Sequence, residues 1–356
     1  MNLVKLGGAE GGLTIATDRA GSQVLVVVVK ATYRVLEDGR VRLAGAQVPP
    51  TVADVSRGEP GRSSLLYESD FATTKPKTDI LLSGHAYAPG GKPTEVLDAQ
   101  MSVGPVTKTV RVFGDRIWKP GFMLGYDLSS PAPFTKMPLV YERAFGGIDE
   151  TEVDDPREER RNPVGRGFHR LTARNIEGTL LPNLENPKEL IRNPYETPEP
   201  AGFGPLGRAW APRVKYAGTY DEAWKEKRFP FLPEDFDERY FQAAPADQIV
   251  GPLKGGEKVT LRNLTPEGRL EFALPAPDVA VKVTGRDELE EELPTVLDTV
   301  LLEPDERRLS LVWRASWRLP VKPSRILEVE AGLLTPARRH AWEQGKEYLD
   351  WTAKRA

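Results

Sequence analysis

The chain has 356 residues, 28% of them charged, with 32 Gly, 32 Pro and no Cys. Its 49 basic and 52 acidic residues leave a formal net charge of −3, so no overall field favours nucleic acid or an anionic membrane. The lack of cysteine excludes thiol nucleophiles, thiolate zinc sites and a disulfide scaffold.

The start of the chain, MNLVKLGG, has no basic segment followed by an apolar stretch of signal-peptide length. The most apolar run, residues 24–29, is far shorter than the roughly 20 residues of a membrane-spanning helix. We therefore expect a cytoplasmic protein without membrane insertion.

The first clear element is a β-hairpin. Residues 24–29 (VLVVVV) are mostly β-branched and continue through residues 33–36 to Asp38 and Gly39, a dipeptide that favours a tight turn. Residues 40–43 then alternate between polar and apolar. The first strand is apolar enough to be buried on both faces, which predicts a place at the centre of a sheet.

Two further stretches are rich in short strands. In residues 78–140 and 258–313, β-branched and apolar runs are separated by turn residues every few positions. This pattern is typical of a sandwich or a barrel. We predict a mainly β protein with an antiparallel β-sandwich-like body, an irregular middle segment rich in proline and aromatic residues, and a C-terminal α-helix.

The middle segment, residues 182–245, holds ten prolines, which exclude long helices and central strands. It also holds eleven aromatic residues, too many for a disordered linker. We expect an ordered layer on the sheets, with short helices near residues 220–227 and 234–242. The final helix is predicted to begin at Thr335 as N-cap and Pro336, and to turn one face inward: Ala341, Trp342, Gly345, Tyr348 and Leu349.

These patterns divide the chain into three regions. Residues 1–150 form an N-terminal β-rich region, residues 151–250 the irregular layer, and residues 251–356 a C-terminal β-rich region that ends in a helix. Because the middle region is too aromatic for a linker, we expect one continuous body.

The three histidines offer little chemistry. His85, His169 and His340 are scattered, and no two have the short spacing of metal ligands. His169 follows a glycine-bearing loop, residues 162–168, which lacks the Lys-Ser/Thr of a phosphate-binding loop and the third glycine of a dinucleotide loop. We expect no cofactor and no metal site.

Carboxylate pairs occur at Asp154-Asp155 and at Asp235 with Asp237. The first pair lies in a highly charged stretch typical of a solvated loop, and the second suits the start of a helix, where acids complement the dipole. No Gly-x-Ser-x-Gly elbow is present. We expect a protein that is not an enzyme; the alternative is a carbohydrate-active or other hydrolase that uses Asp235, Asp237 or His169.

The remaining motifs combine aromatic, Gly, Pro and Arg residues, in residues 112–118, 137–147 and 200–206. Their interpretation as an internal framework is favoured, because buried aromatic residues are mostly core. An exposed aromatic and arginine patch would instead suit a protein-binding hot spot. We expect Asp115 and Arg116 to form an ion pair across a turn, and Arg143 to reach backbone carbonyls across a loop.

The same motifs carry a resemblance. Residues 30–33, 75–80, 84–89, 112–118, 137–147 and 161–165, with later pieces up to Trp313-Arg314, resemble a bacterial family known as domain of unknown function 2169, encoded beside type VI secretion spike components and effectors. The resemblance covers nearly the whole chain. It brings no established active site.

The resemblance implies a cytoplasmic adaptor or chaperone that binds a secreted effector, a PAAR-like tip protein, or both, and assists loading onto the VgrG spike. VgrG itself is a further possible partner, and nucleic acid is not expected. A structural part of a spike or phage-like tail is the second alternative. The candidate partner-binding or framework residues are Arg116, Trp118, Tyr141, Arg143, Phe145, Asn162, Phe203, Trp210, Tyr220 and Trp224.

Overall fold

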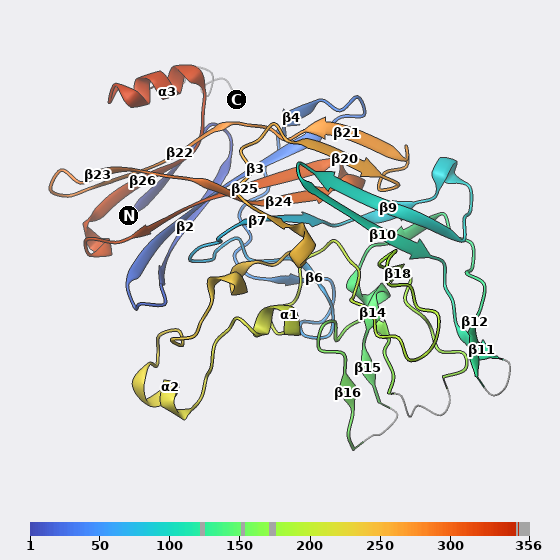
Figure 1. The fold of residues 1–356 in the computed structure, drawn as a ribbon. Helices are drawn as coiled ribbons and strands as arrows, with labels where there is room; N and C mark the ends of the chain where they lie inside the picture. Colours follow the sequence, from blue (N-terminus) through green and yellow to red (C-terminus); the bar gives the residue numbers. More distant parts are fainter. Residues whose placement is uncertain (122–124, 151–153, 171–175, 347, 349–356) are drawn as a thin grey trace.

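The computed structural model describes residues 1–121, 125–150, 154–170, 176–346 and 348 (Figure 1). The largest sheet has seven strands, in the order β19-β7-β24-β25-β3-β2, with β4 also paired to β3. These strands are β2 (Glu10–Thr17), β3 (Gln23–Val35), β4 (Val41–Leu43), β7 (Thr78–Leu82), β19 (Ile249–Val250), β24 (Val296–Glu303) and β25 (Arg308–Arg318). N-terminal and C-terminal strands thus interleave in one sheet.

Two smaller sheets adjoin it. The five-stranded sheet has the order β18-β10-β9-β20-β21: β18 (Leu184–Glu185), β10 (Val106–Phe113), β9 (Val96–Val103), β20 (Lys258–Arg262) and β21 (Arg269–Ala273). The four-stranded sheet has the order β1-β26-β22-β23: β1 (Asn2–Leu6), β26 (Ile326–Leu334), β22 (Asp278–Gly285) and β23 (Glu290–Leu293).

One hydrophobic core joins the three sheets. It includes Val29 of β3, Met101 of β9 and Val281 of β22, all without solvent exposure. Burial of such apolar side chains is the main favourable term in folding. The sheets therefore share their interior.

The predicted hairpin is confirmed. β3 runs from Gln23 to Val35 and pairs with β4 in the register Val35↔Val41. The turn between them closes with a hydrogen bond from the Leu36 amide to the Arg40 carbonyl, and Gly39 takes a φ of 80°. A left-handed residue is required there, and glycine adopts it at little cost. As expected, β3 lies inside the largest sheet, between β25 and β2.

The mainly β fold with one C-terminal helix is confirmed, and the structure adds parallel pairings. β7 pairs with β24 in parallel, as does β1 with β26. Within residues 78–140, where we expected short strands with turns every few positions, Val96–Val103 form the single strand β9. In the described part of the chain, no helix has the length and apolar character needed to cross a membrane.

The middle segment is ordered and irregular, as predicted. It contains α1 (Ala211–Val214), α2 (Glu222–Lys227) and the 3-10 turns Glu238–Phe241 and Ala246–Gln248. The helix expected over residues 234–242 is therefore only a 3-10 turn. Short two-residue and three-residue strands complete the layer and its surroundings: β5 (Val55–Ser56), β6 (Leu65–Tyr67), β8 (His85–Tyr87), β11 (Trp118–Pro120), β12 (Tyr126–Leu128), β13 (Lys136–Pro138), β14 (Phe145–Gly146), β15 (Ile148–Asp149), β16 (Arg157–Glu158) and β17 (Arg166–Gly167).

The C-terminal helix α3 (Pro336–Glu343) begins where the sequence predicted. Thr335 is its N-cap, and the Thr335 hydroxyl accepts a hydrogen bond from the Arg338 amide at 3.2 Å. The helix ends earlier than expected: Gly345, which takes a φ of 61°, and Tyr348 lie beyond it, and Leu349 is outside the described residues. Trp342 does pack inward, against Leu6, Ala280 and Leu334.

Candidate functional site

Four sequence motifs that lie far apart in the chain meet at one place, which we call the motif junction: residues 113–118, 141–147, 162–167 and 180–185. β14 pairs with β17 in parallel, and isolated bridges join Ala144 to Leu184 and Ile117 to Leu180. The junction lies beside β18, at the edge of the five-stranded sheet (Figure 1). The sequence analysis marked the first three of these segments but did not show that they meet.

Asn162 holds two of the segments together. Its side-chain amide donates to the carbonyls of Tyr141 at 2.8 Å and Phe145 at 3.0 Å, and the residue is fully buried. Gly146 lies so close that a Cβ there would be 2.1 Å from the Asn162 carbonyl oxygen. Only glycine allows that approach, which explains the glycine of this motif.

Arg116 is a second tie, and the expected ion pair with Asp115 is wrong. The buried Arg116 guanidinium pairs instead with Glu185 and donates to the Pro182 carbonyl at 2.8 Å. It also stacks on the Phe113 ring, 3.7 Å from the centroid. Burial raises the pKa of Glu185, and the Arg116 charge opposes that rise. The reason for the error is that Arg116 and Asp115 point to opposite sides, one buried and one exposed.

Asn183 is a residue that the sequence analysis did not select. Its side-chain amide donates to Asp115 Oδ1 at 2.9 Å and to the Phe113 carbonyl at 3.1 Å, and its oxygen accepts from Arg143 Nη1 at 2.9 Å. Arg143 therefore reaches side-chain oxygens, not the backbone carbonyls that we expected. The sequence does contain one signal for Asn183. In residues 181–184 (Leu-Pro-Asn-Leu), this polar side chain stands between two leucines, and both leucines are buried in the structure.

The other aromatic residues of the motifs are core. Trp118 and Phe145 form a separate hydrophobic cluster with Ile176, Leu181 and Ile191. Tyr141, Phe203 and Trp210 belong to the main core, where Tyr141 and Trp210 meet edge to face at 5.2 Å between centroids. Together with Arg116 and Asn162 these side chains are buried, so a partner would reach them only after the junction opened.

Tyr220 and Trp224 lie elsewhere, on a segment that projects from the body at the lower left of Figure 1. We call residues 215–232 the α2 excursion. The Tyr220 and Trp224 rings meet at 4.7 Å between centroids, and the Trp224 and Phe229 rings at 5.7 Å. Tyr220 is 54% exposed and Phe229 67%. These rings form an aromatic surface cluster.

Hydrogen bonds within the α2 excursion and across its base fix its shape. Asp221 caps α2 by accepting from the Trp224 amide at 2.8 Å, and the Trp224 indole donates to the Phe231 carbonyl at 2.8 Å. At its base, Thr219 donates to Asp235 through both its amide and its hydroxyl, at 2.9 and 2.7 Å. The exposed rings are therefore held in a defined arrangement by the excursion's own hydrogen bonds.

The carboxylates considered for catalysis are used in such contacts. Asp235 closes the base of the α2 excursion, and Asp237 caps the 3-10 turn that follows by accepting from the Arg239 amide at 2.9 Å. Hydrogen bonds from Thr219 lower the pKa of Asp235, and hydrogen bonds from Arg239 lower that of Asp237. His169 bonds through Nδ1 to the Gly167 carbonyl at 3.1 Å. The capping interpretation is confirmed for Asp237, whereas Asp235 ties Thr219 to the base of the excursion and caps no helix.

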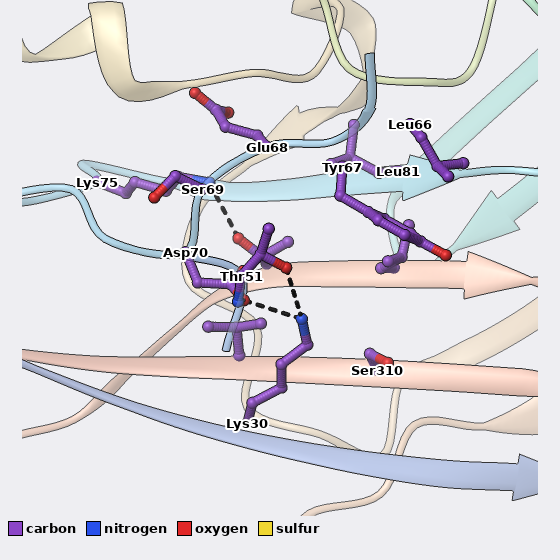
Figure 2. A pocket seen from close by; sticks show the side chains of 13 residues that line it. Lys30, Thr51, Leu66, Tyr67, Glu68, Ser69, Asp70, Lys75, Leu81 and Ser310 are labelled. Carbon is purple, nitrogen blue, oxygen red and sulfur yellow. Dashed lines mark hydrogen bonds and ion pairs between the residues drawn. The ribbon is translucent and has the colours of Figure 1, made fainter. Parts of the chain in front are cut away.

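A buried polar pocket lies on one face of the largest sheet (Figure 2). Lys30 of β3 donates to Asp70 Oδ2 at 2.9 Å and to the Thr51 hydroxyl at 3.3 Å. The same Asp70 oxygen accepts from the Thr51 amide at 2.7 Å. The cavity volume of about 20 Å³ suffices for one water molecule. We interpret this pocket as a structural tie between the sheet and the segment that crosses it.

Comparison with known proteins identifies a family but no characterised relative. No curated protein and no solved structure matches the chain. The model of the family described as uncharacterized protein conserved in bacteria (DUF2169) matches residues 20–314. That match includes the motif junction, the α2 excursion and most of the largest sheet. The chain belongs to the DUF2169 family of uncharacterized bacterial proteins.

Proposed function

We propose that this protein is a cytoplasmic adaptor of a bacterial type VI secretion system, which binds an effector or a PAAR-like tip protein and assists its loading onto the VgrG spike. The resemblance described above suggests this role. The structural observation that carries it is the exposed aromatic cluster on the α2 excursion. We further propose that the protein acts by binding and not by catalysis.

An exposed aromatic cluster suits this role for a physical reason. Tyr and Trp provide large contact areas with few rotatable bonds, and they are enriched among residues that dominate binding energies. Phe229 is exposed next to Trp224, which leaves apolar area in contact with water. Covering this area with an apolar segment of a client is favourable, and the same contact shields that segment.

The first test is co-purification of the tagged, full-length protein with the products of its neighbouring genes, followed by size-exclusion chromatography at moderate salt. We expect a stable stoichiometric complex with an effector or a PAAR-like protein. We also expect this client to be less soluble when it is expressed alone. A client that stays soluble and is loaded normally without the protein would contradict the proposal.

A matched pair of variants connects the complex to the α2 excursion. The double substitution Tyr220→Ala and Phe229→Ala removes two exposed rings of the cluster. Tyr195→Ala removes a ring that is equally exposed, at 69%, but lies outside the excursion. We expect the first variant to lose the client and the second to retain it. If both variants retain the client equally, the client binds to a surface outside the excursion.

A further inference from the structure

A second surface feature lies on the outer side of the motif junction, where one amide and two guanidinium groups surround one carboxylate oxygen. Asp115 Oδ1 accepts from Asn183 Nδ2 at 2.9 Å, and the guanidinium nitrogens of Arg143 and Arg166 lie 3.4 and 4.0 Å from it. The Asp115 side chain is 56% exposed, and both arginines are partly exposed. We call these three charged residues the Arg143–Arg166 site.

The two arginines hold this carboxylate loosely compared with arginines elsewhere in the protein. In the buried interior, Arg314 pairs with Asp298 at 2.5 Å and Arg213 with Glu68 at 2.5 Å. A charge-assisted pair is normally 2.7–2.9 Å long and often bidentate. At the surface site, two guanidinium groups share a single oxygen at longer distances, which leaves donor capacity facing solvent.

Glu142, the acidic residue directly before Arg143, already accepts hydrogen bonds from another part of the chain. Glu142 accepts from the Ser64 amide and hydroxyl, each at 2.8 Å, and only its backbone carbonyl accepts from Arg166 Nε, at 3.0 Å. Burial lowers the pKa of Arg166, and the neighbouring Arg143 charge lowers it further, although Asp115 and Glu142 oppose both effects. Two like charges held this close favour the approach of an additional carboxylate.

An apolar pair lies beside these charges. Exposure alternates from Asp115 to Lys119, so Asp115 and Ile117 lie on the same outer side of an extended stretch. Ile117 forms an antiparallel bridge with Leu180, and both side chains are exposed. The surface therefore presents cationic donors next to a small apolar contact.

We propose that Arg143 and Arg166 bind the carboxylate of an Asp or Glu side chain on an extended segment of the client, while an apolar residue of that segment packs on Ile117 and Leu180. In the free protein, Asp115 fills the site as an internal competitor. This inference rests on the adaptor function for its client, but the carboxylate recognition can be tested without one.

The probe is a synthetic peptide of alternating leucine and glutamate, blocked at both ends, with its glutamine analogue as the control ligand. We expect the full-length protein to bind the glutamate peptide about tenfold more tightly than the glutamine peptide at low salt, because charge-assisted bonds are about twice as strong as neutral ones. The double variant Arg143→Gln and Arg166→Gln loses this preference. Arg62→Gln, at an exposed arginine outside the site, retains it.

Asp115→Asn gives the sharpest test. A competitor role for Asp115 predicts that this variant binds the glutamate peptide more tightly, whereas a framework role predicts weaker binding. If Asp115 occupies the site, its removal strengthens binding of the glutamate peptide several-fold. Arg143→Lys keeps the charge but not the fork geometry, and we expect it to retain part of the preference. Thermal unfolding of each variant shows that the fold is intact.

Three results would overturn the carboxylate site. The wild type could bind both peptides equally, or Asp115→Asn could bind the glutamate peptide more weakly. The third is that Arg62→Gln loses the preference for glutamate as much as the double arginine variant does. These results are separable from those on the adaptor function. A client that co-purifies while the peptide shows no preference contradicts only this inference. A peptide preference with the expected variant pattern, but without any client, supports the carboxylate site and contradicts the adaptor function.

Discussion

The motif junction and the α2 excursion are built from the same residue types and use them in opposite ways. In the junction, most aromatic side chains and Arg116 are buried, and hydrogen bonds tie together segments up to 70 residues apart, as in the bond from Asn183 to the Phe113 carbonyl. In the excursion, the aromatic rings meet edge to face within residues 220–229, and Tyr220 and Phe229 are exposed to solvent. An aromatic and glycine-rich motif therefore does not by itself mark a binding surface. Burial decides which role it plays.

The largest effect that this comparison predicts comes from Arg116. Arg116→Met leaves the buried Glu185 carboxylate without its partner, and we expect a loss of about 3–5 kcal/mol in the free energy of unfolding. Chemical denaturation measures it. The matched control is Arg111→Met, which breaks the pair with Asp98 on a more exposed part of β10 and should cost at most about 1 kcal/mol. If both variants lose the same unfolding free energy, the buried ion pair of Arg116 contributes no more to stability than the exposed pair of Arg111.

A smaller loss is expected at Asn162. Asn162→Ala leaves the buried carbonyls of Tyr141 and Phe145 without these donors, which should cost about 1–3 kcal/mol of unfolding free energy. Asn193→Ala, in the same irregular layer but outside the junction, serves as the control. A cost below that of the control would show that water or neighbouring groups replace the Asn162 bonds.

The excursion should respond weakly in the same assay. Replacing Tyr220 and Phe229 by alanine removes ring contacts that are worth at most about 1.5 kcal/mol each, and their exposure reduces this further. We therefore expect unfolding by denaturant to change little. A loss as large as that of Arg116→Met would make the cluster part of the framework and would weaken its assignment to binding.

The smallest predicted effect is local and depends on pH. Hydrogen bonds from Thr219 lower the pKa of Asp235 from its ordinary value of 3.8. Because the pKa is lower in the folded state, these bonds stabilise the excursion at a pH above the ordinary value, and their contribution is lost as the pH falls through the lowered value. The protection factors of the amides in residues 218–236 against hydrogen exchange, which compare each amide with its intrinsic rate at the same pH, should fall as the medium becomes more acidic than about pH 4.

Asp235→Asn is the control for that effect, because it removes the titrating carboxyl. In this variant, the protection factors of residues 218–236 should fall less on acidification. The same fall in the wild type and in the variant would assign the pH dependence to another group.

Local patterns predicted a large part of this fold. The turn at Asp38-Gly39 and the cap at Thr335 depend on neighbouring residues only, and both were found where the sequence placed them. The parallel pairing of β7 with β24, across more than 200 residues, depends on tertiary packing and leaves no local signal. The same limit applies to the site: the partner of Arg116 is Glu185, 69 residues away, whereas the sequence offered only its neighbour Asp115.

The sequence also could not separate framework from surface among the ten candidate residues. Tyr141 and Tyr220 both stand in aromatic, Gly-containing or Pro-containing surroundings, yet one is buried and the other is half exposed. Burial depends on which segments cover a residue, and the covering segments come from distant parts of the chain. A single sequence contains no direct record of that packing.

We propose that the exposed rings of the α2 excursion bind the client. The most direct measurement is the affinity of the co-purified client for the wild type, for the Tyr220→Ala and Phe229→Ala double variant, and for Tyr195→Ala. We expect the affinity to fall by at least about 30-fold, or about 2 kcal/mol, in the double variant and to stay unchanged in Tyr195→Ala. An unchanged affinity in a folded double variant would contradict it.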